Sequence, residues 1–251
     1  MIRLILSGSS GYMGRTIASL VENRNDMEIV AGFDVNAVKH FSFPVYADPM
    51  EYSGPADVVI DFSNPSALPG LLAYCKKRKL AAVIATTGLS DSDVALIHEA
   101  ARDIPVFRSA NMSLGVSLLS ALAKTAAKLL DSFDIEIIEK HHNRKLDAPS
   151  GTALMLAEAL EEALSEKPEY VYDRHLERKA RDRNEIGIHT VRGGTIVGDH
   201  EIIFAGNDEV IELRHSASSR GVFANGALKA AAFLSGRMPG LYSMNDIISG
   251  L

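Results

Sequence analysis

One short segment near the middle of the chain concentrates side chains that can move protons. Two adjacent histidines, His141 and His142, are followed by Lys145 within the stretch 139–153. Histidine exchanges a proton near neutral pH, and a lysine can hold an anion or donate a proton. These residue types and their close spacing predict acid–base chemistry on a substrate that carries negative charge.

The same segment enters a helix-like run through the sequence Asp-Ala-Pro-Ser-Gly-Thr, residues 147–152. A helix start presents backbone N–H groups and the positive end of the helix dipole, which suits a carboxylate. Two other interpretations use the same residues. The segment could be a surface loop in which Asp or Ser caps the helix. A metal site at His141 and His142 is disfavoured, because adjacent residues rarely point at one ion and the spacing supplies no third ligand, so no metal is expected.

A glycine-rich turn near the N-terminus is the second candidate site. Gly8, Gly11 and Gly14 lie between a strand-like run and a helix-like run. Glycines there allow a tight turn and a close backbone approach, so a pyrophosphate can sit at the helix N-terminus. The spacing G-x-x-G-x-x-G differs from the commoner G-x-G-x-x-G, so the prediction depends on the elements around the turn. Asp34 ends the next strand-like run, where an acid would meet the ribose hydroxyls. The alternative is an ordinary glycine turn followed by a chance aspartate.

The elements around this turn alternate between short apolar runs and helical patterns. The expected strands are Ile2–Leu6, Glu28–Phe33, Asp57–Phe62, Ala81–Thr86 and Pro105–Arg108, and the expected helices are Tyr12–Glu22, Ala67–Lys77 and Asp91–Arg102. Continuous apolar runs are typical of strands covered on both faces. The first half is therefore expected to form a Rossmann-type, doubly wound parallel sheet of the α/β class. The stretch 85–88, at the carboxyl end of a strand, would provide a second contact with the ligand.

From about Ser113 the pattern changes. The sequence predicts helices over Leu114–Leu130, from near Ser150 and over Val222–Ser235, and strands over Ile135–Glu139, Gly187–Val191, Thr195–Val197, Glu201–Ala205 and Val210–His215. Gly-Gly, Gly-Asp and Asn-Asp turns separate the late strands. An α+β domain with a mixed, open-faced sheet is expected. The charged stretch Arg174–Glu185, which includes Glu177, is expected to be a mobile or solvated loop.

Composition narrows the class of protein. The chain has 251 residues and a net charge of −6, which argues against a general nucleic-acid binder but allows a local cationic pocket for an anionic substrate. Its single cysteine, Cys75, excludes an intrachain disulfide. The basic residues after it could activate its thiol, although a part-buried helix position is favoured. With no signal peptide and no apolar run long enough to span a membrane, we expect no membrane association and a cytoplasmic location.

The segment from Glu139 to Ala153 resembles, nearly residue for residue, the active-site signature of the dihydrodipicolinate reductase family, E-x-H-H-x-x-K-x-D-A-P-S-G-T-A. The similarity continues through Ser7–Arg15, Asp57–Ser63, Ala85–Gly88, Ser109–Val116, Arg192–His200 and Arg220–Ala231, and so spans almost the whole chain. It implies an oxidoreductase that uses NADH or NADPH to reduce 4-hydroxy-tetrahydrodipicolinate to tetrahydrodipicolinate in diaminopimelate and lysine biosynthesis.

The resemblance also implies roles for single residues. It implies that His141 is the proton donor and acceptor and Lys145 a second proton donor. His142, Ser150, Gly151 and Thr152 would bind the small dicarboxylate substrate. The implied cofactor contacts are Gly8, Ser9, Ser10, Gly11, Tyr12, Met13, Asp34, Ala85, Thr86, Thr87, Ser109, Ala110, Asn111 and Met112.

In this family a last helix returns to the first domain. We therefore expect a dinucleotide-binding domain of residues 1–112 and 217–251, and a substrate-binding and oligomerisation domain of residues 113–216. The resemblance further implies a homotetramer joined through the second-domain sheets.

The sequence departs from the family at three positions. Ala85 replaces a usual glycine, Met112 a usual phenylalanine, and Val35 stands where an arginine could follow Asp34. A carboxylate without a neighbouring cation repels a 2′-phosphate, so NADH is expected to serve at least as well as NADPH. Lys39 is close enough in sequence to reduce this discrimination.

Two other functions are compatible with parts of the same sequence. A semialdehyde or acyl-phosphate dehydrogenase would share the first domain but needs a cysteine nucleophile, and Cys75 lies in the wrong half of the chain. A nucleotide sensor without catalysis would have no need to keep His141, Lys145 and the 150–152 helix start together.

Overall fold

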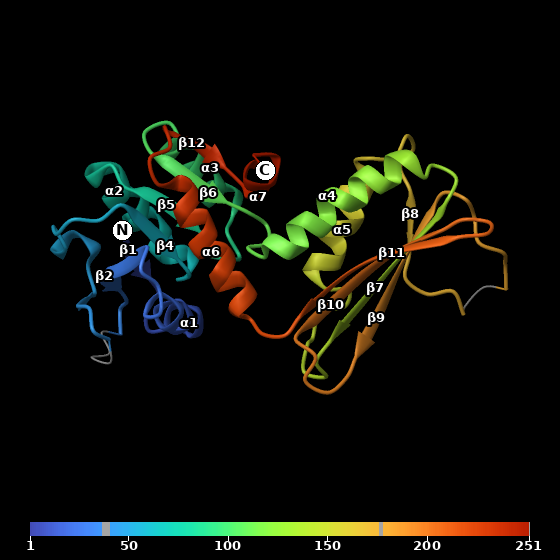
Figure 1. Ribbon diagram of the computed structural model, residues 1–251, viewed down its shortest axis with the longest axis horizontal. Helices are drawn as coiled ribbons and strands as arrows, with labels where there is room; N and C mark the ends of the chain where they lie inside the picture. Colours follow the sequence, from blue (N-terminus) through green and yellow to red (C-terminus); the bar gives the residue numbers. More distant parts are fainter. Residues whose placement is uncertain (37–40, 176–177, 251) are drawn as a thin grey trace. The chain divides into compact units, whose positions relative to one another are not determined.

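The structure is a computed structural model that describes residues 1–36, 41–175 and 178–250. The chain forms two compact units (Figure 1). The first unit consists of Met1–Met112 together with Gly221–Leu251, and the second of Ser113–Arg220. The return to the first unit comes at Gly221 rather than at the expected residue 217, because the last strand of the second unit continues to Ala217.

A parallel sheet forms the centre of the first unit. Within the described residues it has seven strands in the order β12-β6-β5-β4-β1-β2-β3, every neighbouring pair parallel. The strands are β1 (Ile2–Ser7), β2 (Met27–Phe33), β3 (Val45–Tyr46), β4 (Val58–Asp61), β5 (Ala81–Ile84), β6 (Pro105–Arg108) and β12 (Gly240–Tyr242). The order reverses between β1 and β4, as in a doubly wound sheet. This part of the predicted fold is confirmed.

Helices cover the sheet of the first unit. They are α1 (Tyr12–Val21), η1 (Pro49–Glu51), η2 (Pro65–Ala67), α2 (Leu68–Arg78), α3 (Asp91–Ala100), α6 (Gly221–Leu234) and α7 (Met244–Ser249). The late helix α6 packs on α1 and on β4, β5 and β6. Cys75 lies in α2, so the favoured helix position is confirmed, although its side chain is fully buried and not part-buried. Burial raises the pKa of its thiol, so the alternative of activation by the neighbouring basic residues is wrong.

The second unit has a mixed sheet with helices on one face. Its strands are β7 (Asp134–His141), β8 (Glu169–Val171), β9 (Glu185–Arg192), β10 (Gly198–Ala205) and β11 (Val210–Ala217), in the order β11-β10-β7-β9-β8. Strands β7, β9 and β8 are parallel, whereas β10 is antiparallel to both β7 and β11. The helices α4 (Leu114–Leu129) and α5 (Gly151–Glu161) pack on each other, and both contribute to one core with the sheet. The mixed sheet expected from the sequence is confirmed.

The alternation along β7 decides which side chains face the helices. Ile135, Ile137, Glu139 and His141 are buried, while the residues between them are half-buried on the opposite face. This two-residue period follows from strand geometry. It places Glu139 and His141 on the same side of the sheet as α5.

One expected strand of this unit is wrong, and several short elements of both units were not expected. Thr195–Val197 is not a strand: Gly194 has a φ of +47°, the chain turns there, and β10 begins only at Gly198 and runs unbroken to Ala205. The short elements β3, β8, β12 and α7 were not expected, because two to six residues carry too little pattern.

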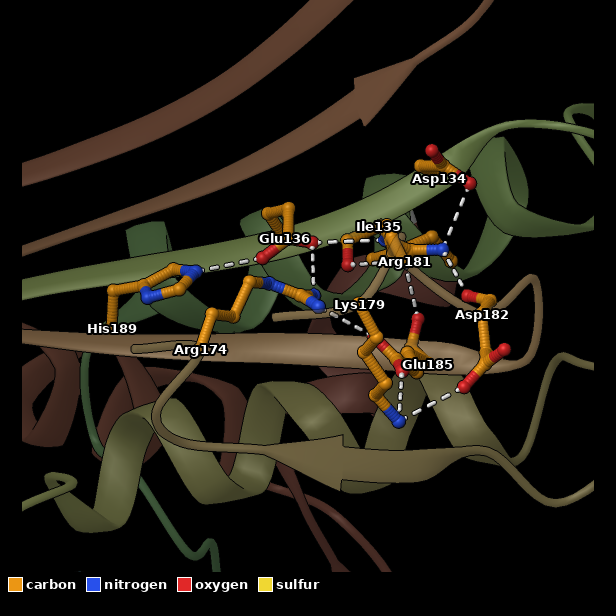
Figure 2. A network of polar contacts seen from close by, with 9 residues as sticks. All are labelled: Asp134, Ile135, Glu136, Arg174, Lys179, Arg181, Asp182, Glu185 and His189. Atoms are coloured by element: carbon orange, nitrogen blue, oxygen red, sulfur yellow. Dashed lines mark hydrogen bonds and ion pairs between the residues drawn. The ribbon is translucent and has the colours of Figure 1, made fainter. Parts of the chain in front are cut away.

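The charged stretch Arg174–Glu185 is not a solvated loop at Arg174 and Arg181, which bind acidic residues of the sheet (Figure 2). Arg174 donates to Glu185 at 2.6 Å and to Glu136 at 2.8 Å. Arg181 donates from Nε to Glu136 at 3.0 Å and from Nη1 to Asp134 at 2.8 Å. Strong charge-assisted bonds therefore tie this stretch to β7 and β9. Glu177 lies outside the described residues.

The carboxylate of Glu136 lies over Gly187 of the neighbouring strand β9. A Cβ at Gly187 would overlap the carboxylate carbon and Oε2 of Glu136, so the absence of a side chain there makes room for the ion pairs. No helix within the described ranges of the chain is long and apolar enough to cross a membrane.

Candidate active site

The glycine-rich turn joins β1 to α1 in the first unit. Gly8 has a φ of +76°, a conformation that favours glycine, and its N–H donates to the carbonyl of Phe33 at 2.8 Å. A Cβ at Gly14 would overlap the carbonyl oxygens of Gly8 and Ser9. The turn can therefore be this tight only with glycine at both positions.

The start of α1 suits an anion. Its N-cap residue is Gly11, no side chain caps the helix, and its first turn contains no acidic residue. The backbone N–H groups and the positive end of the helix dipole therefore meet no competing carboxylate from that turn. These features fit the pyrophosphate of a dinucleotide.

Asp34 follows β2 directly and lies beside this turn. Its Oδ2 accepts from the backbone N–H of Ser10 at 2.9 Å, and its Oδ1 accepts from the N–H of Asn36 at 2.9 Å. The carboxylate is thus held where β2 ends, next to the loop that would hold the phosphates. Val35 is 83% exposed and adds no charge there, and Lys39 lies outside the described residues.

Thr86 and its neighbours follow β5 at the same edge of the sheet. Thr86 donates from Oγ1 to Asp61 Oδ2 at 2.7 Å, and Ser63 donates to Asp61 Oδ1 at 2.6 Å. Asp61 ends β4 and is completely buried, so this carboxylate fixes the chain after two adjacent strands. Ala85 donates its N–H to the Asp61 carbonyl at 2.9 Å, a contact that its side chain does not affect.

The remaining cofactor candidates, residues 109–112, follow β6. Met112 is 5% exposed, and its carbonyl lies against Gly226 of α6. The candidate cofactor residues thus follow β1, β2, β5 and β6. Because parallel strands end at a common edge, the topology gathers all of them at one side of the first unit.

His141 ends β7 in the second unit and pairs with a carboxylate. Its Nδ1 lies 2.6 Å from Oε2 of Glu139, and its side chain is 11% exposed. The two residues are two apart on one strand, so both side chains point to the helix-covered face. A histidine held by a carboxylate in this way is a common arrangement for proton transfer.

Glu139 is completely buried and accepts several hydrogen bonds. Arg192 donates from Nη1 to Oε2 at 2.9 Å and from Nη2 to Oε1 at 2.8 Å. Thr190 donates to Oε1 at 3.0 Å, and the backbone N–H of Ser150 donates to Oε1 at 3.1 Å. Burial alone would raise the pKa of Glu139, but the bonds from Arg192, His141 and Thr190 outweigh it and lower that pKa.

Ser150 caps the start of α5. Its Oγ accepts from the N–H of Ala153 at 3.2 Å and lies 3.1 Å from Nε2 of His200. The first turn of α5 carries no acidic residue, and a Cβ at Gly151 would meet no atom within 4 Å. A carboxylate can therefore approach this helix start, as the sequence predicts. Thr152 follows in the same turn.

His200 lies on β10 beside His141. The ring centroids are 5.2 Å apart, with the ring planes at 74°. His200 is 4% exposed, and burial together with the neighbouring His141 lowers its pKa to about 4. It is therefore uncharged near neutral pH.

Lys145 is tied to this group through its loop. Its Nζ lies 2.8 Å from Oδ1 of Asp147, and the carbonyl of Asp147 accepts from Arg192 Nη2 at 2.7 Å. Arg192 thus connects the lysine loop with Glu139.

His142 lies in the same loop, and its pKa is lowered by burial and by the nearby cations Arg144 and Arg220. The structure gathers His141 and Ser150 around Glu139, and Lys145 at the edge of the same network.

The sequence did not identify three of these residues as parts of the site. Glu139 belongs to the motif but has no role in the sequence-based prediction of the site, and the same holds for Arg192 and His200. The spacing of Glu139 and His141 within a strand-like run was a usable signal, because residues two apart on a strand share a face.

Two sequence models of one family match the chain. The model described as "Dihydrodipicolinate reductase, N-terminus" matches residues 2–112. The model described as "Dihydrodipicolinate reductase, C-terminus" matches residues 115–248. Together they cover most of both units.

Individual proteins are similar over the whole length. A 4-hydroxy-tetrahydrodipicolinate reductase from Caldanaerobacter subterraneus subsp. tengcongensis is 56% identical over 248 residues, 99% of this chain and 98% of that protein. A protein of the same name from Clostridium tetani is 50% identical over 250 residues, again 99% of this chain and 98% of that protein. The solved structure of a dipicolinate-bound dihydrodipicolinate reductase from a Paenisporosarcina species has a TM-score of 0.82 and 27% identity, covering 98% of this chain and 99% of that one.

Proposed function

Because the chain belongs to the dihydrodipicolinate reductase family of oxidoreductases, we propose that it reduces 4-hydroxy-tetrahydrodipicolinate to tetrahydrodipicolinate with NADH or NADPH. The reaction would serve diaminopimelate and lysine biosynthesis in the cytoplasm. The first unit would bind the dinucleotide and the second the substrate. The single observation that carries the proposal is the His141–Glu139 pair next to the start of α5, whose first turn has no acidic residue.

The substrate proposal rests on the chemistry of that helix start. A dicarboxylate needs fixed hydrogen-bond donors, and the first turn of α5 offers backbone N–H groups without a competing acid. Arg144 and Lys145 add positive charge to the preceding loop. The related Paenisporosarcina structure holds dipicolinate, a planar dicarboxylate, which supports the same class of ligand here.

The proposed chemistry divides between the cofactor and the chain. Loss of the substrate's 4-hydroxyl as water leaves a conjugated C=N/C=C system, to which the reduced nicotinamide would supply a hydride when bound. His141 holds a proton at Nε2 and donates it where negative charge accumulates on the substrate, while its Nδ1–H donates to Glu139. Lys145, held near Asp147, is the second proton donor and stabilises negative charge.

For the choice of nucleotide, we propose that NADH is used at least as well as NADPH. The Asp34 carboxylate is fixed by two backbone N–H groups at the end of β2, and the exposed Val35 beside it is uncharged. A free ribose hydroxyl can donate to such a carboxylate, whereas a 2′-phosphate is repelled by it.

For the assembly, we propose a homotetramer joined through the sheets of the second unit. The face of the sheet opposite α4 and α5 carries Glu136, Lys140 and Glu201 and the half-buried Ile138. Light scattering of the purified chain checks this: a mass of four chains is expected, and a stable monomer would contradict it.

The reaction is tested by mixing the full chain with freshly generated 4-hydroxy-tetrahydrodipicolinate and following the ultraviolet absorbance of the reduced nicotinamide. Wild-type protein should oxidise the nucleotide only when the intermediate is present, which a nucleotide sensor would not do. His141→Ala and Lys145→Ala should each lower kcat by ~10²–10⁴-fold and leave nucleotide affinity near wild type. Lys128→Ala, in the exposed last turn of α4, is the control and should keep normal turnover. Near-normal turnover of the His141 and Lys145 variants would place the chemistry elsewhere.

A further inference from the structure

The buried carboxylate of Glu139 contacts both the proton-transferring histidine and the start of α5. We infer that Glu139 is a positioning residue, which fixes His141 as the Nδ1–H tautomer and so leaves Nε2 to exchange the proton with the substrate. The inference rests on the proposed function, in which His141 acts on the substrate.

The register of the sheet assembles the group around Glu139. Glu139 is paired with Thr190 of β9 and with His200 of β10, and His141 is paired with Arg192. Paired residues on neighbouring strands point to the same face. The strands therefore bring all of these side chains to the face that α5 covers.

Arg192 keeps Glu139 in its acceptor form. A buried carboxylate is costly unless it is paired and hydrogen-bonded, and Arg192 donates one bond to each of its oxygens, at 2.9 and 2.8 Å. An ionised carboxylate can only accept hydrogen bonds. The 2.6 Å contact with His141 therefore requires a proton on Nδ1 of the imidazole.

The other oxygen of Glu139 reaches the substrate side. Oε1 accepts the backbone N–H of Ser150 at 3.1 Å, directly before the first turn of α5. One carboxylate thus orients the ring that would donate the proton and the helix start that would bind a substrate carboxylate. The arrangement matches the way a buried acid orients a catalytic histidine in other enzymes.

Glu136 offers a matched control on the same strand. It also contacts a histidine, His189, at 2.7 Å, and it also accepts from two arginines (Figure 2). It lies three residues before Glu139, so its side chain points to the opposite face of β7. A role that is only structural predicts similar effects when either carboxylate becomes an amide.

The test compares Glu139→Gln, Glu139→Asp and Glu136→Gln in the full chain. The first readout is the ¹⁵N spectrum of histidine-labelled, ligand-free protein, with His141→Gln used to assign the signals. Wild type and Glu136→Gln should show neutral His141 protonated on Nδ1. In Glu139→Gln the amide NH₂ can donate to Nδ1, so the proton should move to Nε2. The shorter Glu139→Asp should keep the wild-type tautomer, because it remains an acceptor.

The second readout is steady-state kinetics. Glu139→Gln should lower kcat by ~10²–10³-fold with nucleotide affinity unchanged, Glu139→Asp should recover part of this loss, and Glu136→Gln should stay within about threefold of wild type. Should Glu139→Gln fail to fold, the tautomer of His141 in wild type and in Glu139→Asp still tests the inference, which requires the proton on Nδ1 in both. A wild-type His141 protonated on Nε2, or unchanged tautomer and turnover in a folded Glu139→Gln, overturns the inference. The spectrum does not depend on turnover. If wild type is inactive but shows the expected tautomers, the proposed reaction is refuted while the orientation of His141 by Glu139 still holds.

Discussion

The Oγ atom of Ser150 lies 3.1 Å from Nε2 of His200, and this contact links the first residue before α5 to strand β10. His200 is 4% exposed, and burial with the nearby His141 lowers its pKa to about 4. An uncharged imidazole can share a hydrogen with a hydroxyl, whereas a charged ring here would be buried with no carboxylate of the described residues hydrogen-bonded to it.

Stability should depend on the titration of His200. Between the ordinary pKa of about 6.5 and the folded value of about 4, the unfolded chain binds a proton that the folded chain does not. The stabilising contribution is therefore complete above pH ~6.5 and is lost as the pH falls towards ~4, by roughly 2–4 kcal/mol. Denaturant unfolding of wild type and His200→Gln at several pH values measures this. The stability difference between the two proteins should shrink on acidification, and parallel curves would contradict the assignment.

Removing the cap of α5 should affect substrate binding as well as stability. Ser150→Ala loses the bond to the Ala153 N–H and the contact with His200, so the free energy of unfolding should fall by ~1–2 kcal/mol. The substrate KM should rise, because the helix start is no longer fixed. Ser90→Ala is the control: it removes the cap of α3 in the first unit, with a similar loss of stability expected. Equal KM values for the two variants would argue against a substrate carboxylate at α5.

A cation next to Asp34 should improve the use of NADPH. Val35 is 83% exposed, so Val35→Arg adds a positive charge without disturbing the bonds of the Asp34 carboxylate to Ser10 and Asn36. We expect kcat/KM for NADPH to rise about threefold to tenfold, with little change for NADH. Val35→Gln adds a polar side chain without charge and should have no such effect. A wild-type kcat/KM clearly higher for NADPH would reverse the proposed preference.

The glycine turn should tolerate no side chain at Gly14. A Cβ there would overlap the backbone of Gly8 and Ser9, so Gly14→Ala should cost ~1–3 kcal/mol of stability and weaken nucleotide binding at least about tenfold. Gly70→Ala provides the matched control, because a Cβ at this α2 position meets no atom within 4 Å. It should leave binding unchanged and stabilise the fold slightly. Titration of NADH fluorescence and thermal unfolding measure both effects.

The sequence was sufficient for β1, β2, β4, β5 and β6 of the first sheet, because these strands form its interior and have continuous apolar runs, whereas the short β3 and β12 were missed. Leu4, Ile5, Val59 and Ile60 are all fully buried, and such strands appear as continuous apolar runs. The same reasoning failed at Thr195–Val197. Those residue types favour strands, but Gly194 turns the chain with a φ of +47°, and local turn geometry prevailed over β propensity.

Only some of the residues of the candidate site could be predicted from the sequence, for a different reason. His141, Lys145 and Ser150 belong to one contiguous motif, so their proximity followed from the sequence. Arg192 and His200 approach Glu139 only through the register of β9 and β10 against β7. A shift of one residue would turn those side chains to the other face, and sequence alone does not fix the register. In the same way, the charge of Arg181 could be counted, but its bonds to Asp134 and Glu136 could not.

Helix α6 also constrains how the protein can be made. Ribosomes release a chain from its N-terminus, so β1 to β6 emerge before α6, whose Ala227, Leu228 and Leu234 are almost wholly buried and which packs on β4, β5 and β6. The second unit is continuous and emerges complete in between. It can therefore fold during translation, while the first unit stays unfinished, with apolar surface accessible to chaperones, until α6 and β12 have left the exit tunnel.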